Sequence, residues 1–433
     1  MKSGKDGAQS AKITYGMGGL VCAAGTTLLP LLLPLCRAVG LSTAALGVAC
    51  GLSCLSVALV PLFYALINGN TLIATGRYHI PFVVSSLLVA LCAVGITCVG
   101  KLHAAAQALV LFGLFFLLAL AMQIFAYTYF SIGKRLAQGG SAFAYSKLFA
   151  YLSPLLGALA TLWLFDFDRV SIRAVVCLAG LIVLVGLVGA YMATCNRMAL
   201  FLRVEPHHKR TLGENYKRFF APLSNPRARW RFAAVLLTVA GVALAACAFP
   251  QLVFAARLGY TKGLKPTALI GTACIALVGG ISSFWRGTER GAARTALILC
   301  ILAAVATLVV VVLRFFAVRK IVSPIVGYIY AAVVGLALGG ALPCVGKQSG
   351  LAAQETGVSS GRVYTLFNCA VTVGLALGTA LSGTFAYWAG RHARWATATA
   401  LVAFAVLLLA GTVLCFVLSK LAPLERQDEK ENG

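Results

Sequence analysis

Long apolar runs separated by short polar breaks dominate this chain. Runs of about 20 residues, the length that lets a helix cross a bilayer, lie at 13–36, 44–67, 80–99, 104–130, 143–165, 171–196, 232–256, 266–285, 295–315, 321–346, 363–389 and 395–419. In hydrocarbon, backbone N–H and C=O groups must be paired within the segment, so these runs predict α-helices; a β-barrel would show short alternating stretches. The pattern predicts an all-α polytopic membrane protein with about twelve transmembrane helices.

A polar stretch at 197–231 divides these runs into two groups of six. We predict a tail at 1–12, a six-helix bundle at 13–196, a basic central loop at 197–231, a second six-helix bundle at 232–419 and a tail at 420–433. The first run is too long for the core of a signal peptide, which favours a retained first helix. Two groups of six spans joined by a basic loop are typical of transporters built from two pseudo-symmetric bundles, with the solute held between them.

Composition supports the membrane assignment and explains the charge. The chain is 61% hydrophobic and 11% charged, which excludes an ordinary soluble protein. Its net charge of +25 would indicate nucleic acid in a soluble protein. Here, placing both termini in the cytoplasm assigns 24 of the 36 Lys and Arg residues to the inner side, as the positive-inside rule expects. We therefore predict no nucleic-acid partner, a central loop against anionic membrane lipid, and location in the cell membrane.

The ionisable and sulfur-containing residues do not form an enzyme's active site. The fourteen cysteines lie almost entirely inside apolar runs, with no CxxC pair or His/Cys cluster, so we expect packing cysteines and neither a metal nor a cofactor. The eleven acidic residues avoid the span interiors, which leaves no general acid–base pair and no catalytic residue. The lack of a carboxylate at mid-membrane favours passive facilitation over proton coupling, although coupling through His79 or a loop acid stays open.

Uncharged polar residues inside the spans predict a site for a small neutral solute. Gln123 and Asn368 are the strongest candidates, because an amide offers both a donor and an acceptor. For every candidate the alternative is a helix–helix hydrogen bond. The further candidate contacts are Tyr127, Ser153, Gln251, Ser282 and Thr372. Residues predicted to serve helix packing or bending are Pro30, Gly157, Pro250, Gly374 and Gly378.

Several short stretches resemble the equilibrative nucleoside transporters, whose fold is a variant of the major facilitator bundle. Leu28-Leu29-Pro30 is similar to that family's opening Leu-Leu-Pro motif, and Phe249-Pro250 to its Phe-Pro in the seventh span. Asn68, followed by Arg77 and Ile80, resembles its Asn-to-Arg-x-x-Ile stretch. The stretch from Gly374 through Gly378 to Ser382 resembles its last-span glycine pattern. The resemblance implies a carrier for nucleosides or nucleobases.

Two departures fall where the family's function is decided. The family's eighth span usually carries Asp-x-x-Gly-Arg, whereas this chain has Ser282-Ser-Phe-Trp-Arg286, so only Arg286 matches, as a solute contact or inner gate. The family has eleven spans, and the run at 395–419 makes a twelfth, as in a general major facilitator. Two other functions therefore stay open: a carrier for sugars, amino acids or drugs, and a non-transporting scaffold or receptor. The sequence does not indicate the oligomeric state.

Overall fold

The computed structural model describes residues 12–20, 43–63, 79–99, 102–136, 145–152, 155, 184, 211–254, 264–284, 289–316, 324–358 and 360–421. These residues are helical apart from short connections, and no strand occurs among them. The prediction of an all-α protein is confirmed. Expected span 171–196 lies outside the described residues except for residue 184, and spans 13–36 and 143–165 are described only in part, at 12–20, 145–152 and 155.

In the first half of the chain, the described helices follow the apolar runs closely. Helix α4 (Thr43–Leu52) continues into the 3-10 helix η2 (Ser53–Leu59), and α7 (His79–Cys98) matches the run at 80–99. Helix α8 (Ala104–Leu136) extends six residues past the end predicted at 130. Polar residues near the end of a span can continue a helix into the interface, which a search for apolar residues does not detect.

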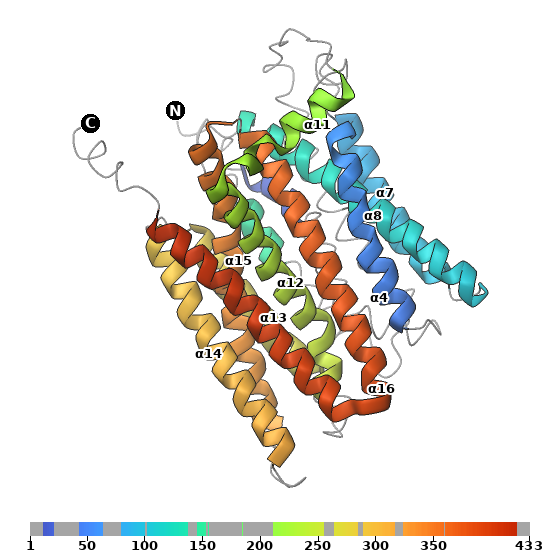
Figure 1. Ribbon diagram of the computed structural model, residues 1–433, viewed down its shortest axis with the longest axis vertical. Helices are drawn as coiled ribbons and strands as arrows, with labels where there is room; N and C mark the ends of the chain where they lie inside the picture. The colour runs from blue at the N-terminus through green and yellow to red at the C-terminus, as the bar shows by residue number, and fades with distance from the viewer. Residues whose placement is uncertain are drawn as a thin grey trace.

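The second half forms a bundle of long helices that lie side by side (Figure 1). It contains α12 (Pro226–Phe254), α13 (Leu264–Phe284), α14 (Glu289–Phe316), α15 (Pro324–Thr356) and α16 (Ser360–Lys420). In α16 the backbone leaves helical geometry at His392 (φ −135°, ψ 62°), so α16 consists of two arms. The arms correspond to the runs predicted at 363–389 and 395–419.

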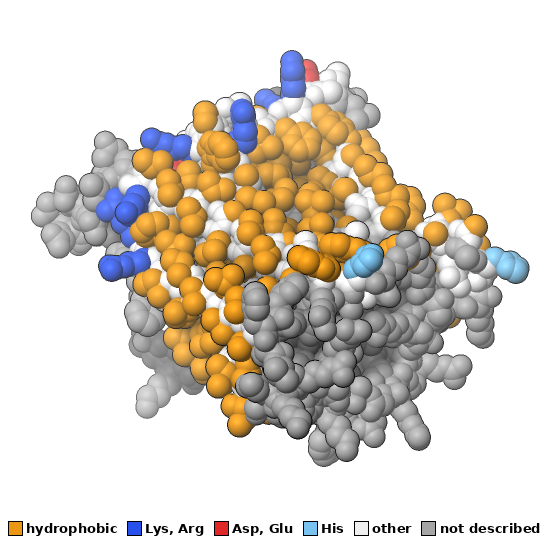
Figure 2. All heavy atoms as spheres, turned by 60° about the horizontal axis from the view of Figure 1, so that its bottom comes forward, with side chains coloured by type: hydrophobic (Ala, Val, Ile, Leu, Met, Phe, Trp, Pro, Cys, Tyr) orange, Lys and Arg blue, Asp and Glu red, His pale blue; other side chains and the backbone are white. Residues whose placement is uncertain are grey.

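In the described part of the chain, six helices are long and apolar enough to span a membrane when the two arms of α16 are counted separately. The candidate membrane-spanning segments are Ala105–Tyr129, Pro226–Ala245, Arg290–Leu313, Ile325–Thr356, Arg362–Ala389 and Trp395–Lys420. A broad apolar face is visible in Figure 2, with Lys and Arg side chains along one of its edges. This distribution is the one expected of helices embedded in lipid with cations at the water boundary. The protein is an integral membrane protein.

The end of the polar central segment is helical. Helix α11 (Leu212–Phe220) begins with a capping box, in which the Thr211 hydroxyl accepts from the Glu214 N–H and the Glu214 carboxylate accepts from the Thr211 N–H. The 3-10 helix η6 (Ala221–Ser224) follows, and α12 begins at Pro226, where the Asn225 side chain accepts from the Arg227 N–H. The segment predicted as the central loop at 197–231 thus contains helices from Leu212 onward, because local capping signals start helices within a polar stretch.

Small residues allow the two halves to approach each other closely, and two of these contacts are related by the expected symmetry. In α4, a methyl group on Gly47 would lie 3.0 Å from the carbonyl oxygen of Ala380 in the first arm of α16. In α13, a methyl group on Gly279 would lie 2.7 Å from Tyr151 Cγ of the helical segment 145–152. In the predicted order of spans these contacts join the second with the eleventh and the fifth with the eighth. When the two bundles are exchanged, the second span takes the place of the eighth and the eleventh takes the place of the fifth. The first contact then becomes the second, as two pseudo-symmetric bundles require.

Candidate solute site between the two halves

Helix α8 and the first arm of α16 bring Gln123 and Asn368 together across 245 positions of sequence. The Asn368 Nδ2 group donates to Gln123 Oε1 at 2.8 Å, and Gln123 Nε2 donates to the Asn368 carbonyl oxygen at 2.8 Å. Gln123 Nε2 also donates to the hydroxyl of Thr372, one helical turn beyond Asn368. Three predicted solute contacts therefore form one polar cluster, which we call the amide cluster.

The amide cluster lies inside the apolar stretches of both helices. Gln123 precedes Tyr129, the end of its stretch, by six residues, and Asn368 follows Arg362, the start of its stretch, by six. At 1.5 Å per residue, both amides lie about 9 Å from the ends of these stretches, well inside the apolar part of each helix. Gln123 is only 1% exposed. An unpaired amide in such surroundings is strongly unfavourable, and the hydrogen bonds between the two side chains avoid this cost.

The cluster is uncharged, which limits the chemistry it can perform. It contains two amides and a hydroxyl, and these groups can donate and accept hydrogen bonds but transfer no proton at neutral pH. When the helices separate, each amide would expose one donor and one acceptor edge. The arrangement is suited to exchanging protein–protein hydrogen bonds for bonds to a neutral polar solute.

Aromatic side chains continue the same helix beyond the cluster. Tyr129 stacks on Tyr15 with ring centroids 4.5 Å apart, and each phenol donates to the other residue's carbonyl oxygen, at 2.6 Å and 2.7 Å. Phe125 stacks on Tyr129 at 5.6 Å, and Tyr127 is buried as well. A methyl group on Gly18 would lie 2.3 Å from the Tyr129 ring, so glycine is required for this stack. The aromatic residues fix the start of the first span against the end of α8.

The structure describes the other predicted solute contacts only in part. Ser282 donates to the carbonyl oxygen of Gly279 in its own helix at 2.9 Å. Gln251 lies in the last turn of α12, and its side chain is outside the described residues. Ser153 and Arg286 also lie outside the described residues. Their proposed roles stay predictions from sequence.

Of the residues predicted for packing or bending, Gly374 and Gly378 show very close contacts. A methyl group on Gly378 would lie 2.4 Å from the Ala240 carbonyl oxygen of α12, and one on Gly374 would lie 2.8 Å from the Leu236 carbonyl oxygen. The backbones of α12 and α16 approach each other here as they do at small-residue helix contacts in membranes. Pro250 lies within α12, four residues before its end, while Pro30 and Gly157 are outside the described residues.

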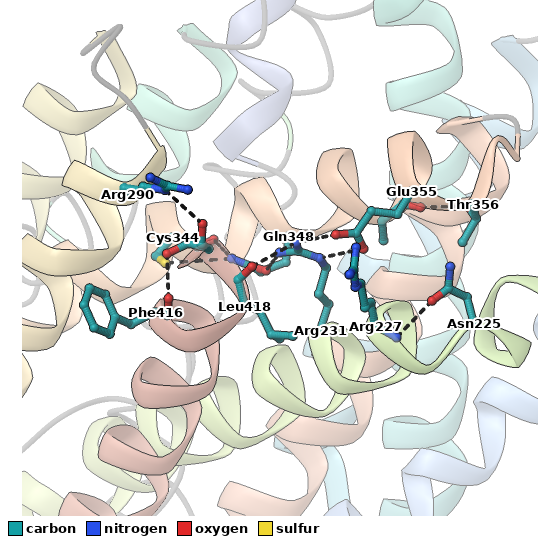
Figure 3. A network of polar contacts seen from close by, with 12 residues as sticks. Asn225, Arg227, Arg231, Arg290, Cys344, Gln348, Glu355, Thr356, Phe416 and Leu418 are labelled. Atoms are coloured by element: carbon teal, nitrogen blue, oxygen red, sulfur yellow. Dashed lines mark hydrogen bonds and ion pairs between the residues drawn. The ribbon is translucent and has the colours of Figure 1, made fainter. Parts of the chain in front are cut away.

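Sequence reasoning missed a buried ionic network near one end of the second bundle (Figure 3). Arg231 is 0% exposed, and its guanidinium binds both carboxylate oxygens of Glu355, from Nη2 at 2.6 Å and from Nε at 3.0 Å. Its Nη1 donates to Gln348 Oε1 at 2.7 Å, and its Nη2 to the Leu418 carbonyl oxygen at 3.5 Å. The bidentate pair joins α12, α15 and the second arm of α16. In the sequence, Arg231 is the last residue of the predicted loop at 197–231, and Glu355 lies beyond the predicted span end at 346, so only the helical extension of both segments reveals the pair.

Comparison with known proteins identifies the fold. No family model matches the sequence, and no curated protein matches it. Two structures of the nucleoside transporter NupG match with a TM-score of 0.57, at 15% and 14% identity, over 96% and 95% of this chain and 100% and 98% of theirs. The human organic anion transporter MFSD10 (TETRAN) matches with a TM-score of 0.58 at 15% identity, over 94% of this chain and 99% of its own. The chain therefore has a major-facilitator-like fold, as the sequence predicted.

Proposed function

We propose that this protein is a membrane carrier that moves a small neutral polar solute by alternating access, with nucleosides or nucleobases as the leading solutes. The amide cluster is the observation that carries the proposal. It joins the two halves of the chain inside the membrane, so a solute that bonds to Gln123 and Asn368 would replace contacts that hold the halves together. Binding energy would thereby be coupled to movement, as alternating access requires.

The choice of nucleosides rests on chemistry and on similarity. A nucleobase presents donors and acceptors along one edge, and a side-chain amide can pair with such an edge. Phe125 and Tyr129 follow Gln123 in α8 by two and six residues, so stacked aromatic rings lie in the same part of this helix. NupG, which has a similar structure, is a nucleoside transporter. We further propose that the protein lies in the cell membrane with both termini and the central segment in the cytoplasm.

A second candidate is a carrier for a different solute class. MFSD10, which is about equally similar in structure, is an organic anion transporter. The amide cluster is uncharged, however, and an anion would favour a cation among its binding groups. This difference favours a neutral solute.

Uptake into liposomes tests the proposal. Purified protein would be reconstituted, and uptake of radiolabelled adenosine, hypoxanthine and glucose measured with and without a pH gradient. We expect saturable adenosine or hypoxanthine uptake that is indifferent to the gradient. Uptake of glucose alone would contradict the nucleoside assignment, and uptake only under a gradient would contradict passive facilitation. No uptake of adenosine or hypoxanthine would also contradict the nucleoside assignment.

A further inference from the structure

The segment that links the two halves has a strongly basic outer face. Its only acidic residue between 211 and 231 is Glu214, whose carboxylate is used in the capping box of α11. Four cations of α11 and the first turn of α12 are exposed: Lys217, Arg218, Arg227 and Arg229. We call these four residues, with Phe220 and Trp230, the α11–α12 surface.

Two exposed aromatic residues accompany these cations. Trp230 is 56% exposed and Phe220 37% exposed, and each is within two positions of an exposed Arg. The apolar stretch of α12 begins at Pro226 and runs to Ala245, so this surface lies where α12 enters the membrane. Exposed aromatic rings beside Lys and Arg are typical of protein surfaces at the level of the lipid headgroups.

The inner side of the same segment is anchored. The Tyr216 phenol donates to the Ala58 carbonyl oxygen at 2.5 Å, and Phe219 is fully buried. Arg362 Nη1 donates to the Arg218 carbonyl oxygen at 3.4 Å, and Arg229 Nε donates to the Leu223 carbonyl oxygen at 3.2 Å. The backbone that carries the four cations is therefore held in one position, and binding to them requires little ordering of the chain.

We propose that the α11–α12 surface binds the headgroups of anionic phospholipids, and that it selects them over zwitterionic lipids. The charge excess supplies the selectivity, and Trp230 and Phe220 supply contact with the upper part of the acyl chains. Each Lys or Arg near an anionic surface contributes a factor of about five in affinity. This proposal does not depend on the identity of the transported solute.

Quenching of Trp230 fluorescence by brominated lipid measures this preference directly. The full chain would be reconstituted in phosphatidylcholine membranes that contain a small fraction of brominated phosphatidylserine, or the same fraction of brominated phosphatidylcholine. The contribution of Trp230 is the difference between the wild type and Trp230→Phe. We expect stronger quenching of Trp230 by brominated phosphatidylserine, with a preference that weakens as salt is added.

Charge variants locate the preference on the surface. In the combined variant K217Q, R218Q, R227Q and R229Q, the preference for phosphatidylserine over phosphatidylcholine should be about tenfold lower or more. A control variant with R294Q and K420Q, which removes exposed cations of α14 and α16 near the same end of the bundle, should retain it. Equal quenching by the two lipids would overturn the proposal. A preference unchanged in the fourfold variant would also overturn it.

Discussion

At the scale of single residues, the amide pair of Gln123 and Asn368 is the contact through which solute binding would act. Replacing Gln123 with Ala leaves the Asn368 side-chain N–H without its acceptor and removes a candidate solute contact. We expect uptake of the transported solute to fall about tenfold or more, since one to two lost hydrogen bonds correspond to roughly 1–2 kcal/mol. Uptake into liposomes at matched protein content measures the effect.

The same helix offers a matched control for this substitution. Gln107 is also in α8, but its side chain donates only to the nearby Leu102 carbonyl oxygen at 2.8 Å. Gln107→Ala should leave uptake unchanged. If Gln123→Ala transported normally, Gln123 would be a packing residue and the amide cluster would have no role in solute binding.

Among the ionic groups that the structure describes, Arg231 is the one whose loss should lower stability most. Arg231→Ala would leave the Glu355 carboxylate, 13% exposed, without its bidentate partner. Breaking a buried ion pair on one side typically destabilises a protein by about 3–5 kcal/mol. A clear drop in the melting temperature of the detergent-purified protein is the expected result.

A nearby arginine provides the comparison for Arg231. Arg229 is exposed and donates a single hydrogen bond, to the Leu223 carbonyl oxygen. Arg229→Ala should lower the melting temperature little, because exposed contacts of this kind contribute at most about 1 kcal/mol. Similar melting temperatures for the two variants would mean that the Arg231 network does not stabilise the bundle.

At the scale of elements, the contact between α12 and the first arm of α16 depends on glycine. Gly378→Leu would force a side chain into the Ala240 carbonyl and the neighbouring Ala243 methyl group, and the helices would have to separate. Overpacking of this kind costs about 1–3 kcal/mol or more. We expect a lower melting temperature and reduced uptake.

Gly113 in α8 is the matched glycine for this test, because a methyl group there would have no heavy atom within 4 Å. Gly113→Leu should be tolerated and could favour the helix slightly, since glycine is a poor helix former. Equal tolerance of Leu at both positions would show that the close approach at Gly378 is not needed.

The apolar runs predicted most helices closely but not their polar extensions. Helices α7 and α13 match their runs within two residues at each end. Helix α15, by contrast, continues ten residues past the predicted 346, through Gln348 and Glu355, because these polar side chains are buried against Arg231. A search for apolar residues ends where polarity begins, and only the partner on another helix explains why the polar turns stay ordered.

The candidate site could be predicted by residue but not by pairing. Gln123, Asn368 and Thr372 were recognisable as polar groups inside apolar runs. Their mutual contact depends on which faces of α8 and α16 meet. When a helix is apolar all round, its sequence does not indicate which face contacts a neighbouring helix. The same reason explains why Tyr15 and Tyr129 could not be paired from sequence.

At the scale of the whole molecule, the orientation in the membrane is the prediction that most needs a measurement. Epitope tags inserted after His103 and after Thr211, both exposed in the structure, would be stained in intact and permeabilised cells. We expect the tag after His103 to be reached from outside and the tag after Thr211 only after permeabilisation, because positive residues favour the inner side. Staining of both tags from the same side would contradict the two-bundle arrangement.

The anchoring of α11 would also set an energy difference between the states of the proposed carrier. Val60 of the first half and Leu366 of the second half both pack on Phe219, while Tyr216 bonds to Ala58. Opening the molecule at this end would lose this hydrogen bond and part of the burial of Phe219, which contribute about 2–4 kcal/mol in addition to the contacts of the amide cluster. Without solute, the α11 contacts alone would favour the closed arrangement at this end over the open one by a ratio of about 30 to 1,000. If the protein is the proposed carrier, its empty form would be open mainly at the opposite end.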